Sequence, residues 1–264
     1  MLAAALAALA VATPAAASPA PTVEQAALGS VSATFTYTKT GDFEYRGMRV
    51  QVTRGGVSAY DAVAAPPDCP QPYCAPLGSV DERSLKVVDL DGDGEPEVLV
   101  DLYTGGAHCC VVTEVLRWDG ARYVLTTRNF ADFGYTLDGG TFVTGDARFA
   151  YSFAAFAFSV LPVRLLTFSG GRWTDVTRAH PETLRAEAGR LMKEYRKYRR
   201  GRRSLGVLAG WVADEYRLGR RAQADAFLRG ELRHGRLRSE APWPGGKAYI
   251  KALQRRLRMW GYTR

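Results

Sequence analysis

The chain has 264 residues, of which 47% are hydrophobic and 23% charged. This composition is typical of a folded globular protein and excludes an intrinsically disordered chain. The formal net charge of +8 is unevenly distributed: residues 1–180 carry 13 Lys and Arg against 19 Asp and Glu, whereas residues 181–264 carry 22 against 8. This shift predicts an acidic part at 30–180 and a basic part at 181–264.

The first twenty residues, MLAAALAALAVATPAAASPA, are small and apolar and end in sites suited to signal peptidase. The run is too short for a membrane span, and no other run reaches that length. We interpret residues 1–20 as a signal peptide or leader, with a disordered Ala/Pro leader as the alternative. The true start codon is left open because no basic n-region precedes the apolar run. The mature protein is expected to be secreted, without a transmembrane segment.

The next 150 residues have mostly the pattern of β-strands. Residues 31–38, VSATFTYT, alternate apolar and polar side chains, and residues 48–53 repeat the alternation. The Pro- and Cys-rich segment 65–78 interrupts the pattern, since proline cannot donate to a strand ladder. Further strands are predicted at 85–90, 97–103, 110–118, 121–127, 149–158, 163–169 and 172–178.

A weak internal repeat runs through this part. LRWDGARYV (116–124) and LTFSGGRWTDV (166–176) each join a strand, a glycine turn and an arginine-aromatic pair, and VQVTRGG (50–56) is a more worn third copy. Leu-Asp-Gly precedes two of them, at 90–92 and 137–139. The offset is about the length of a propeller blade. A closed propeller needs at least about four blades, so we expect no complete ring.

After Pro181 the apolar period becomes that of a helix. The apolar stripe begins with Leu184 and Ala188, and proline is tolerated in a first turn. Further helices are predicted at 205–216, 222–229 and 250–260, stopped by Gly219, Gly230 and Gly261. The predicted fold is therefore segregated α+β: an N-terminal antiparallel β domain of about three propeller-blade-like units, not closed into a ring, followed by a small helical bundle.

Residues 87–110, VVDLDGDGEPEVLVDLYTGGAHCC, hold the densest acidic cluster. Three carboxylates occupy alternate positions before a glycine, and hard oxygens at this spacing suit Ca²⁺, which takes six to eight oxygen ligands. An EF-hand is excluded because its twelfth position, which must be Glu, is Val100, and 97–103 is a predicted strand. The candidate ligands are Asp89, Asp91, Asp93, Glu95 and Glu97.

The loop resembles the calcium loop of FG-GAP repeats, the integrin-alpha-type or VCBS-type repeats of extracellular proteins, in which D-x-D-x-D-G-x-x-D/E lies in a hairpin. The resemblance implies a structural Ca²⁺, with Glu95 contributing its backbone carbonyl and the other four residues their side chains. The related segment 137–141 keeps only one carboxylate, that of Asp138, and should bind nothing. A solvated acidic turn is the alternative. Catalysis is disfavoured because a saturated ion has no open coordination position.

Four cysteines, Cys69, Cys74, Cys109 and Cys110, predict two disulfides in an exported chain. If Cys69 pairs with Cys74, the adjacent Cys109 and Cys110 are left to each other. The crossed pairings would join the 65–78 loop to the strand that follows the glycine pair at 105–106, and we favour one or two such crosslinks.

TGGAHCC (104–110) resembles a signature of uncharacterised secreted bacterial proteins and implies no activity. A zinc or nucleophile role for His108 and the two adjacent cysteines is disfavoured, because neighbouring residues of a strand point to opposite faces. A free surface histidine is the simpler interpretation of His108.

Residues 193–203, KEYRKYRRGRR, mix arginines and tyrosines as a nucleic-acid patch does. Because the tyrosines belong to the apolar stripe, we expect no nucleic acid. A solvated basic face, or a contact with an anionic cell-wall polymer, membrane headgroups or an envelope protein, fits better. IKALQRRLRMWGY (250–262) resembles the first helix of peptidoglycan-binding domains. The possible wall-binding residues are Leu253, Gln254, Leu257, Gly261 and Tyr262.

The leading hypothesis is a secreted, non-enzymatic binding or structural module with one calcium-stiffened loop, associated with the cell envelope. One alternative is an extracellular hydrolase with an acidic cleft at the β/α boundary, using Asp101, Asp132 or Asp146. Glycoside-type chemistry would need two of these carboxyls about 5–10 Å apart, and nothing in the sequence pairs them. The other alternative is a peptidoglycan-binding protein acting through its last helix.

Overall fold

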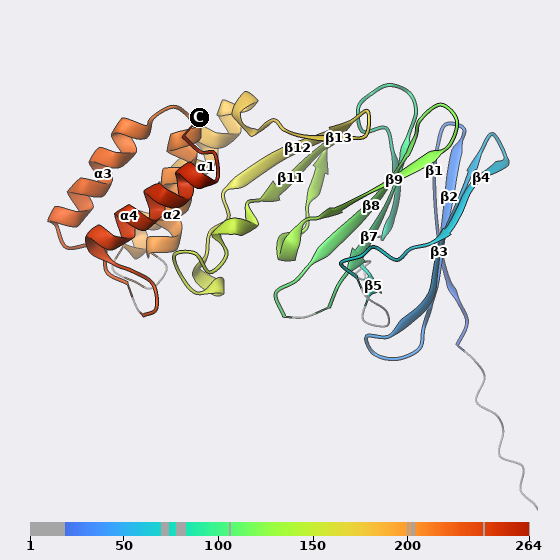
Figure 1. Ribbon diagram of the computed structural model, residues 1–264, viewed down its shortest axis with the longest axis horizontal. Coiled ribbons are helices and arrows are strands. Elements are labelled where there is room, and N and C mark those ends of the chain that lie inside the picture. Colours follow the sequence, from blue (N-terminus) through green and yellow to red (C-terminus); the bar gives the residue numbers. More distant parts are fainter. Residues whose placement is uncertain are drawn as a thin grey trace, which may run out of the picture.

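The computed structural model describes residues 19–69, 74–77, 83–105, 107–199, 201, 204–239 and 241–263 (Figure 1). In these residues thirteen strands form three antiparallel sheets, and four α-helices follow. The predicted α+β fold is therefore confirmed. Among the described helices, none has both the length and the apolar content needed to cross a membrane. Most of the predicted leader, residues 1–18, lies outside the described residues.

The first sheet is a meander of β1 (Thr22–Leu28), β2 (Val31–Lys39), β3 (Tyr45–Arg54) and β4 (Val57–Val63). The alternation predicted for 31–38 is present, because Val31, Ala33 and Phe35 are buried while the residues between them are more exposed. No strand was predicted at β1 or β4. Neither contains a fully buried residue, so neither has the apolar face that periodicity detects.

The second sheet lies in the middle of the β region and is the most deeply buried. Its strands run in the order β5-β7-β8-β9, and β6 also pairs with β7. Almost every side chain of β7 and β8 is buried, because both faces of this sheet are covered. The strands are β5 (Ala75–Pro76), β6 (Leu85–Val88), β7 (Glu97–Tyr103), β8 (Val111–Trp118) and β9 (Tyr123–Asn129).

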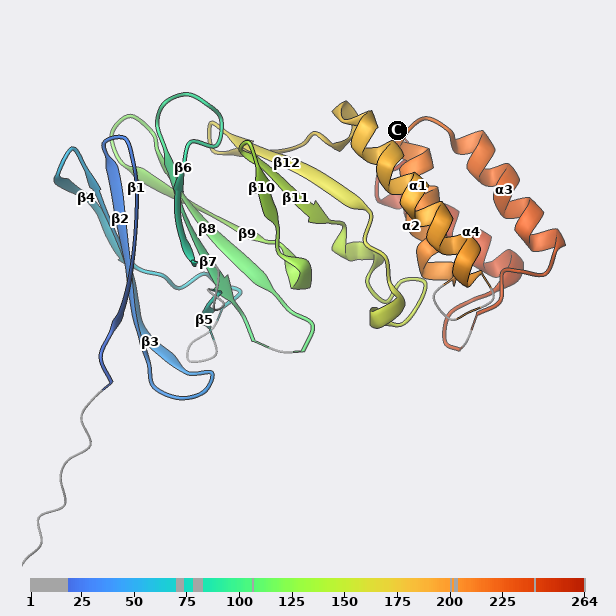
Figure 2. The same cartoon turned by 180° about the vertical axis from the view of Figure 1, so that it is seen from behind.

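The third sheet is another meander, of β10 (Thr136–Asp138), β11 (Thr141–Gly145), β12 (Val163–Ser169) and β13 (Arg172–Asp175). Figure 2 shows the three sheets side by side in a row, with the helices beyond the third. One apolar core joins the first sheet to the second, and a separate core joins the second to the third. The row does not close, as predicted.

The internal repeat of the sequence corresponds to equivalent hairpins in the three sheets. The repeated segments are the last hairpins of the three sheets, β3–β4, β8–β9 and β12–β13. Leu-Asp-Gly marks the turn before β7 in the second sheet and the β10–β11 turn in the third. The three units thus share one four-stranded antiparallel pattern, to which the second sheet adds β5.

The helices are α1 (Pro181–Tyr198), α2 (Ser204–Arg217), α3 (Arg221–Arg233) and α4 (Gly246–Met259). α1 begins at Pro181 as predicted. The expected stop at Gly230 is wrong, because α3 continues through this residue and the chain turns at Gly235, whose φ is +63°. Of Gly230 and Gly235, only Gly235 has the left-handed backbone that favours glycine after a helix.

The predicted strand at 149–158 is also wrong. This segment contains the 3₁₀ turns η2 (Ala147–Phe149) and η3 (Phe156–Phe158), and its Phe149 and Phe153 are buried among the helices. It lies directly on α2: a Cβ at Gly206 would stand 2.2 Å from the carbonyl oxygen of Phe158. A short apolar run buried against helices cannot be distinguished from a strand by composition alone.

Candidate functional site

The acidic loop between β6 and β7 brings three of its five carboxylates together. Asp89, Asp91 and Glu97 each offer one oxygen, and these oxygens lie within 4.8 Å of one another. Glu97 is buried at the start of β7, while Asp91 is exposed, so the group opens towards solvent on one side. Three converging hard oxygens fit a cation such as Ca²⁺.

Backbone hydrogen bonds hold two of these carboxylates in place. The two oxygens of Asp89 accept from the backbone N–H groups of Gly92, at 2.8 Å, and Gly94, at 3.0 Å. Both glycines have positive φ, 75° and 85°, which the tight turn requires. Glu97 Oε2 accepts from the Leu90 N–H at 3.0 Å. The loop is therefore ordered by its own backbone.

Asp93 and Glu95 lie outside this group. Asp93 Oδ1 accepts from the Glu95 N–H at 2.8 Å. The Glu95 side chain turns to the first sheet, where Arg54 Nη2 donates to Oε1 at 2.7 Å and Nη1 pairs with Oε2. With its carboxylate engaged there, Glu95 can offer an ion only its backbone carbonyl, the role that the sequence resemblance implies.

Glu97 is 1% exposed, and burial raises its pKa to about 7. The charges of Asp91 and Asp93 raise the pKa further, while the hydrogen bond from Leu90 opposes the shift. Three acidic groups held close together repel one another unless a proton or a cation offsets their charge.

The acidic loop also contacts both neighbouring sheets. On one side Glu95 binds Arg54 at the end of β3, and on the other Leu90 touches Gly140 in the β10–β11 turn, where a Cβ would stand 2.3 Å from the Leu90 carbonyl oxygen. The intact loop thus rests against its degenerate copy at 137–141. Sequence reasoning missed these two partners, although both lie in the repeated turns TRGG and LDGG.

The cysteines pair locally, Cys69 with Cys74 and Cys109 with Cys110, and the favoured crossed pairing is wrong. The Cα atoms of Cys69 and Cys74 lie 4.9 Å apart, within the range that a disulfide spans. Cys109 and Cys110 precede β8, which begins at Val111, so the strand geometry assumed for them does not apply.

His108 is exposed, as expected for a surface histidine, and its ring lies 3.9 Å from that of Phe156, centroid to centroid. It also meets the ring of Tyr151 edge to face, at 6.3 Å. With both neighbouring sulfurs joined in a disulfide, the structure offers no thiolate beside this histidine to bind zinc or act as a nucleophile.

Two of the three carboxyls considered for hydrolysis, Asp101 and Asp146, are held by hydrogen bonds from other side chains. Asp101 lies on β7, buried between the second and third sheets, and binds Lys86, Thr113 Oγ1 at 2.6 Å and Tyr135 OH at 3.0 Å. Asp132 lies in the 3₁₀ turn η1 (Ala131–Phe133).

Asp146 follows β11 and accepts from Arg148 Nε at 2.8 Å and Tyr262 OH at 2.7 Å. Although burial disfavours its charged form, these hydrogen bonds hold the pKa of Asp146 below its usual value. A carboxylate so strongly held in its charged form is a poor general acid, and it lies on a different element from Asp101.

The possible wall-binding residues of α4 face inward. Leu253 and Leu257 are fully buried in the helical core and Tyr262 is 2% exposed, while Gln254 donates to Asp225 Oδ1 at 2.9 Å. Gly261 follows the helix with a φ of +82°. Packing therefore explains the peptidoglycan-like pattern, and a polymer cannot reach the three buried side chains.

No family model matches the chain. A segment of 103 residues is 32% identical to a probable thylakoid lumen protein of the cyanobacterium Synechocystis sp.. The match covers 35% of this chain, and the chain spans 30% of that relative's length. An alignment with a Xanthomonas protein related to a type IV secretion system covers 58% of this chain and 92% of that protein, at 12% identity. Its TM-score of 0.18 is too low to indicate a shared fold or function.

Proposed function

We propose that this is an extracytoplasmic, non-enzymatic binding or structural protein whose row of three sheets is braced by one calcium ion in the acidic loop. The observation that carries the proposal is the position of that loop. It contacts the first sheet through Arg54 and the third through Gly140, while it belongs to the second. An ion bound there would stiffen the junction of all three sheets.

The proposed ligands are the side chains of Asp89, Asp91, Asp93 and Glu97 and the backbone carbonyl of Glu95. The convergence of three of these carboxylates supports the assignment. The fourth, Asp93, lies in the same loop, between Asp91 and Glu97, and its Oδ1 accepts from the Glu95 N–H. When bound, Ca²⁺ would supply charge neutralisation and crosslinking and no chemistry.

The location outside the cytoplasm is supported by three features: the leader-like start of the sequence, the two disulfides, and the partial similarity to a protein named for the thylakoid lumen. Disulfides persist in oxidising compartments and are rare in the cytosol. A secreted, envelope-associated protein is our finer proposal, with an anionic wall polymer or an envelope protein as the partner, since the helical region is strongly basic.

The experiment is calcium titration of the purified chain, stripped with a chelator, with the melting temperature as the readout. Binding to the folded state stabilises it by about 2.7 kcal/mol when calcium is at 100 times its dissociation constant. That corresponds to a rise in melting temperature of several degrees. Asp91→Ala should abolish the rise.

The matched control is Asp138→Ala, in the degenerate loop copy at 137–141. This variant should keep the full response to calcium. A wild-type melting curve that stays unchanged in saturating calcium removes the calcium proposal, and an equal loss in both variants places the ion elsewhere.

A further inference from the structure

Five arginines gather where the third sheet meets the helices. A pocket of about 120 Å³ is lined by Arg128, Arg148 and Arg164. A second pocket, of about 280 Å³, is lined by Arg148 and Arg164 together with Arg178 and Arg217. Because the two pockets share two arginines they adjoin, and we call them together the arginine cleft.

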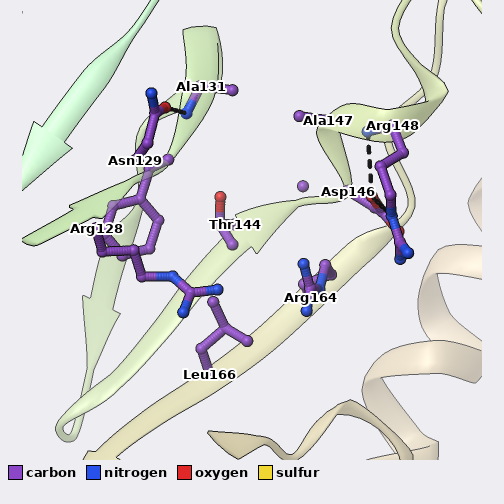
Figure 3. Close-up of a pocket in the computed structure, with 11 residues that line it drawn as sticks. Arg128, Asn129, Ala131, Thr144, Asp146, Ala147, Arg148, Arg164 and Leu166 are labelled. Carbon is purple, nitrogen blue, oxygen red and sulfur yellow. Dashed lines mark hydrogen bonds and ion pairs between the residues drawn. The ribbon is translucent and has the colours of Figure 1, made fainter. Parts of the chain in front are cut away.

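The fold assembles the cleft from five separate elements. Arg128 lies on β9, Arg148 in η2, Arg164 on β12, Arg178 in the 3₁₀ turn η4 (Thr177–Ala179) and Arg217 at the end of α2. Figure 3 shows Arg128 and Arg164 extending into the smaller pocket from different strands, with Arg148 at its other end, bound to Asp146.

The positive charge of the cleft is only partly balanced. Its acidic lining residues are Asp146, paired with Arg148, and Asp175, whose Oδ2 accepts from Arg164 Nη2 at 3.0 Å. Among the described residues no carboxylate forms an ion pair with the other three arginines, Arg128, Arg178 and Arg217. The lining residues, five arginines and two aspartates, thus carry a net charge of +3, and behind the lining the carboxyls of Glu187 and Asp214 also act on Arg217.

Arg128 carries an unsatisfied donor. Its Nε is buried and has no hydrogen-bond partner, while its guanidinium group lies 4.6 Å from the centre of the Trp173 ring. Burial lowers the pKa of Arg128, and the nearby charge of Arg164 lowers it further. A buried N–H without an acceptor costs about 1–3 kcal/mol, and a ligand oxygen that reached this donor would offset that cost.

Arg178 and Arg217 are held near each other by main-chain oxygens. Arg178 donates to the carbonyls of Arg217 and Tyr262, each at 2.9 Å, and Arg217 Nη1 donates to the Val163 carbonyl at 2.5 Å. Burial and the charge of Arg217 lower the pKa of Arg178. The carbonyls fix the two guanidinium groups close enough to repel each other, and nearby carboxyls offset this repulsion only in part. An anion in the pocket would relieve it further.

We propose that the arginine cleft binds a phosphate group. Guanidinium groups bind phosphate through pairs of parallel N–H donors, and a phosphate monoester brings close to two negative charges, whereas a single carboxylate brings one. Two sources share this chemistry, a small phosphorylated molecule and the phosphodiester chain of an anionic wall polymer. The inference goes beyond the proposed function and does not depend on the calcium site.

The test is isothermal titration calorimetry of the full chain in a chelator at about 0.15 M salt, where distant surface charges are screened. The probes are inorganic phosphate, glycerol phosphate, poly(glycerol phosphate) and, as the carboxylate comparison, acetate. We expect phosphate probes to bind and acetate not to bind. Preference for glycerol phosphate indicates a small molecule, and preference for the polymer indicates the wall.

Arg128→Gln and Arg178→Gln should each weaken binding about tenfold or more, a loss of about 1.4 kcal/mol. The control is Arg229→Gln, on the exposed face of α3 and outside both pockets, which should bind as the wild type does. If a cleft variant fails to fold by circular dichroism, lysine replaces glutamine at the same position, as Arg128→Lys or Arg178→Lys, because lysine keeps the charge and loses the paired donors. The proposal is overturned if the wild type binds no phosphate probe, if acetate binds equally well, or if the cleft variants bind normally.

Discussion

Gly140 lies so close to Leu90 that a Cβ at position 140 would stand 2.3 Å from the Leu90 carbonyl oxygen. Leu90 begins the Leu-Asp-Gly turn of the second sheet, and Gly140 directly follows the Leu-Asp-Gly of the third. The third sheet therefore packs onto the second through the turn that carries the acidic loop. The contact with Leu90 is possible because glycine has no side chain at position 140.

Gly140→Ala should destabilise the fold by about 2–4 kcal/mol, since it combines a clash with main-chain atoms and a φ of +79°. The measure is the free energy of unfolding in urea. Gly139→Ala is the control, because position 139 also has a positive φ, +49°, with nothing within 4 Å of its Cβ. Its cost should be about 1 kcal/mol. Equal losses would contradict the close contact.

Tyr262→Phe should cost about 1.5–3 kcal/mol, because the Tyr262 hydroxyl donates to the buried, charged carboxylate of Asp146 at 2.7 Å. Tyr249→Phe is the matched comparison: the Tyr249 hydroxyl is equally buried but donates to the neutral carbonyl of Leu205 at 2.9 Å. Its loss should cost about 1 kcal/mol. Thermal unfolding of both variants at neutral pH gives the difference, and a smaller cost for Tyr262→Phe would count against a charged Asp146.

Glu114→Gln should stabilise the protein at pH 8 and have little effect near pH 4.5. Burial raises the pKa of Glu114 to about 7, partly opposed by a hydrogen bond from the Ala65 backbone. The folded carboxyl thus holds its proton to a higher pH than the unfolded one, whose pKa is about 4.3. The wild-type free energy of unfolding therefore falls between about pH 4.5 and 7 and then levels off.

The gain in Glu114→Gln at pH 8 should reach up to about 3 kcal/mol, at 1.36 kcal/mol for each unit of pKa shift. Comparison with the wild type at each pH cancels the contribution of other titrating groups. Glu44→Gln, at an exposed position, serves as the control and should show no such trend. A gain of the same size at both pH values would rule out the raised pKa as its cause.

The local disulfide pairing predicts the products of a tryptic digest without reduction. Cleavage after Lys and Arg places Cys69 and Cys74 in the peptide 55–83 and Cys109 and Cys110 in the peptide 87–117. Because each bond lies within one peptide, mass spectrometry should find the two peptides separate, each two hydrogens lighter than its reduced form. A crosslinked product of both peptides would restore the crossed pairing.

The sequence by itself determined the local elements and their order. Alternation located β2 and most of the central strands, and a change of period at Pro181 located α1, because each pattern reports a side-chain face that must be buried. The acidic loop could also be predicted, since its residues lie close together in the chain. The prediction of a strand at 149–158 was wrong because the surface on which this segment packs, on α2, is distant in the sequence.

Only the tertiary structure decided which distant residues meet. Glu95 and Arg54 are 41 positions apart and Asp146 and Tyr262 are 116 apart, and no periodicity reports such pairs. The five arginines of the cleft are spread from 128 to 217, in a sequence rich in arginine, so no spacing distinguishes them. Periodicity records whether a side chain is buried, whereas a binding site depends on which elements pack together.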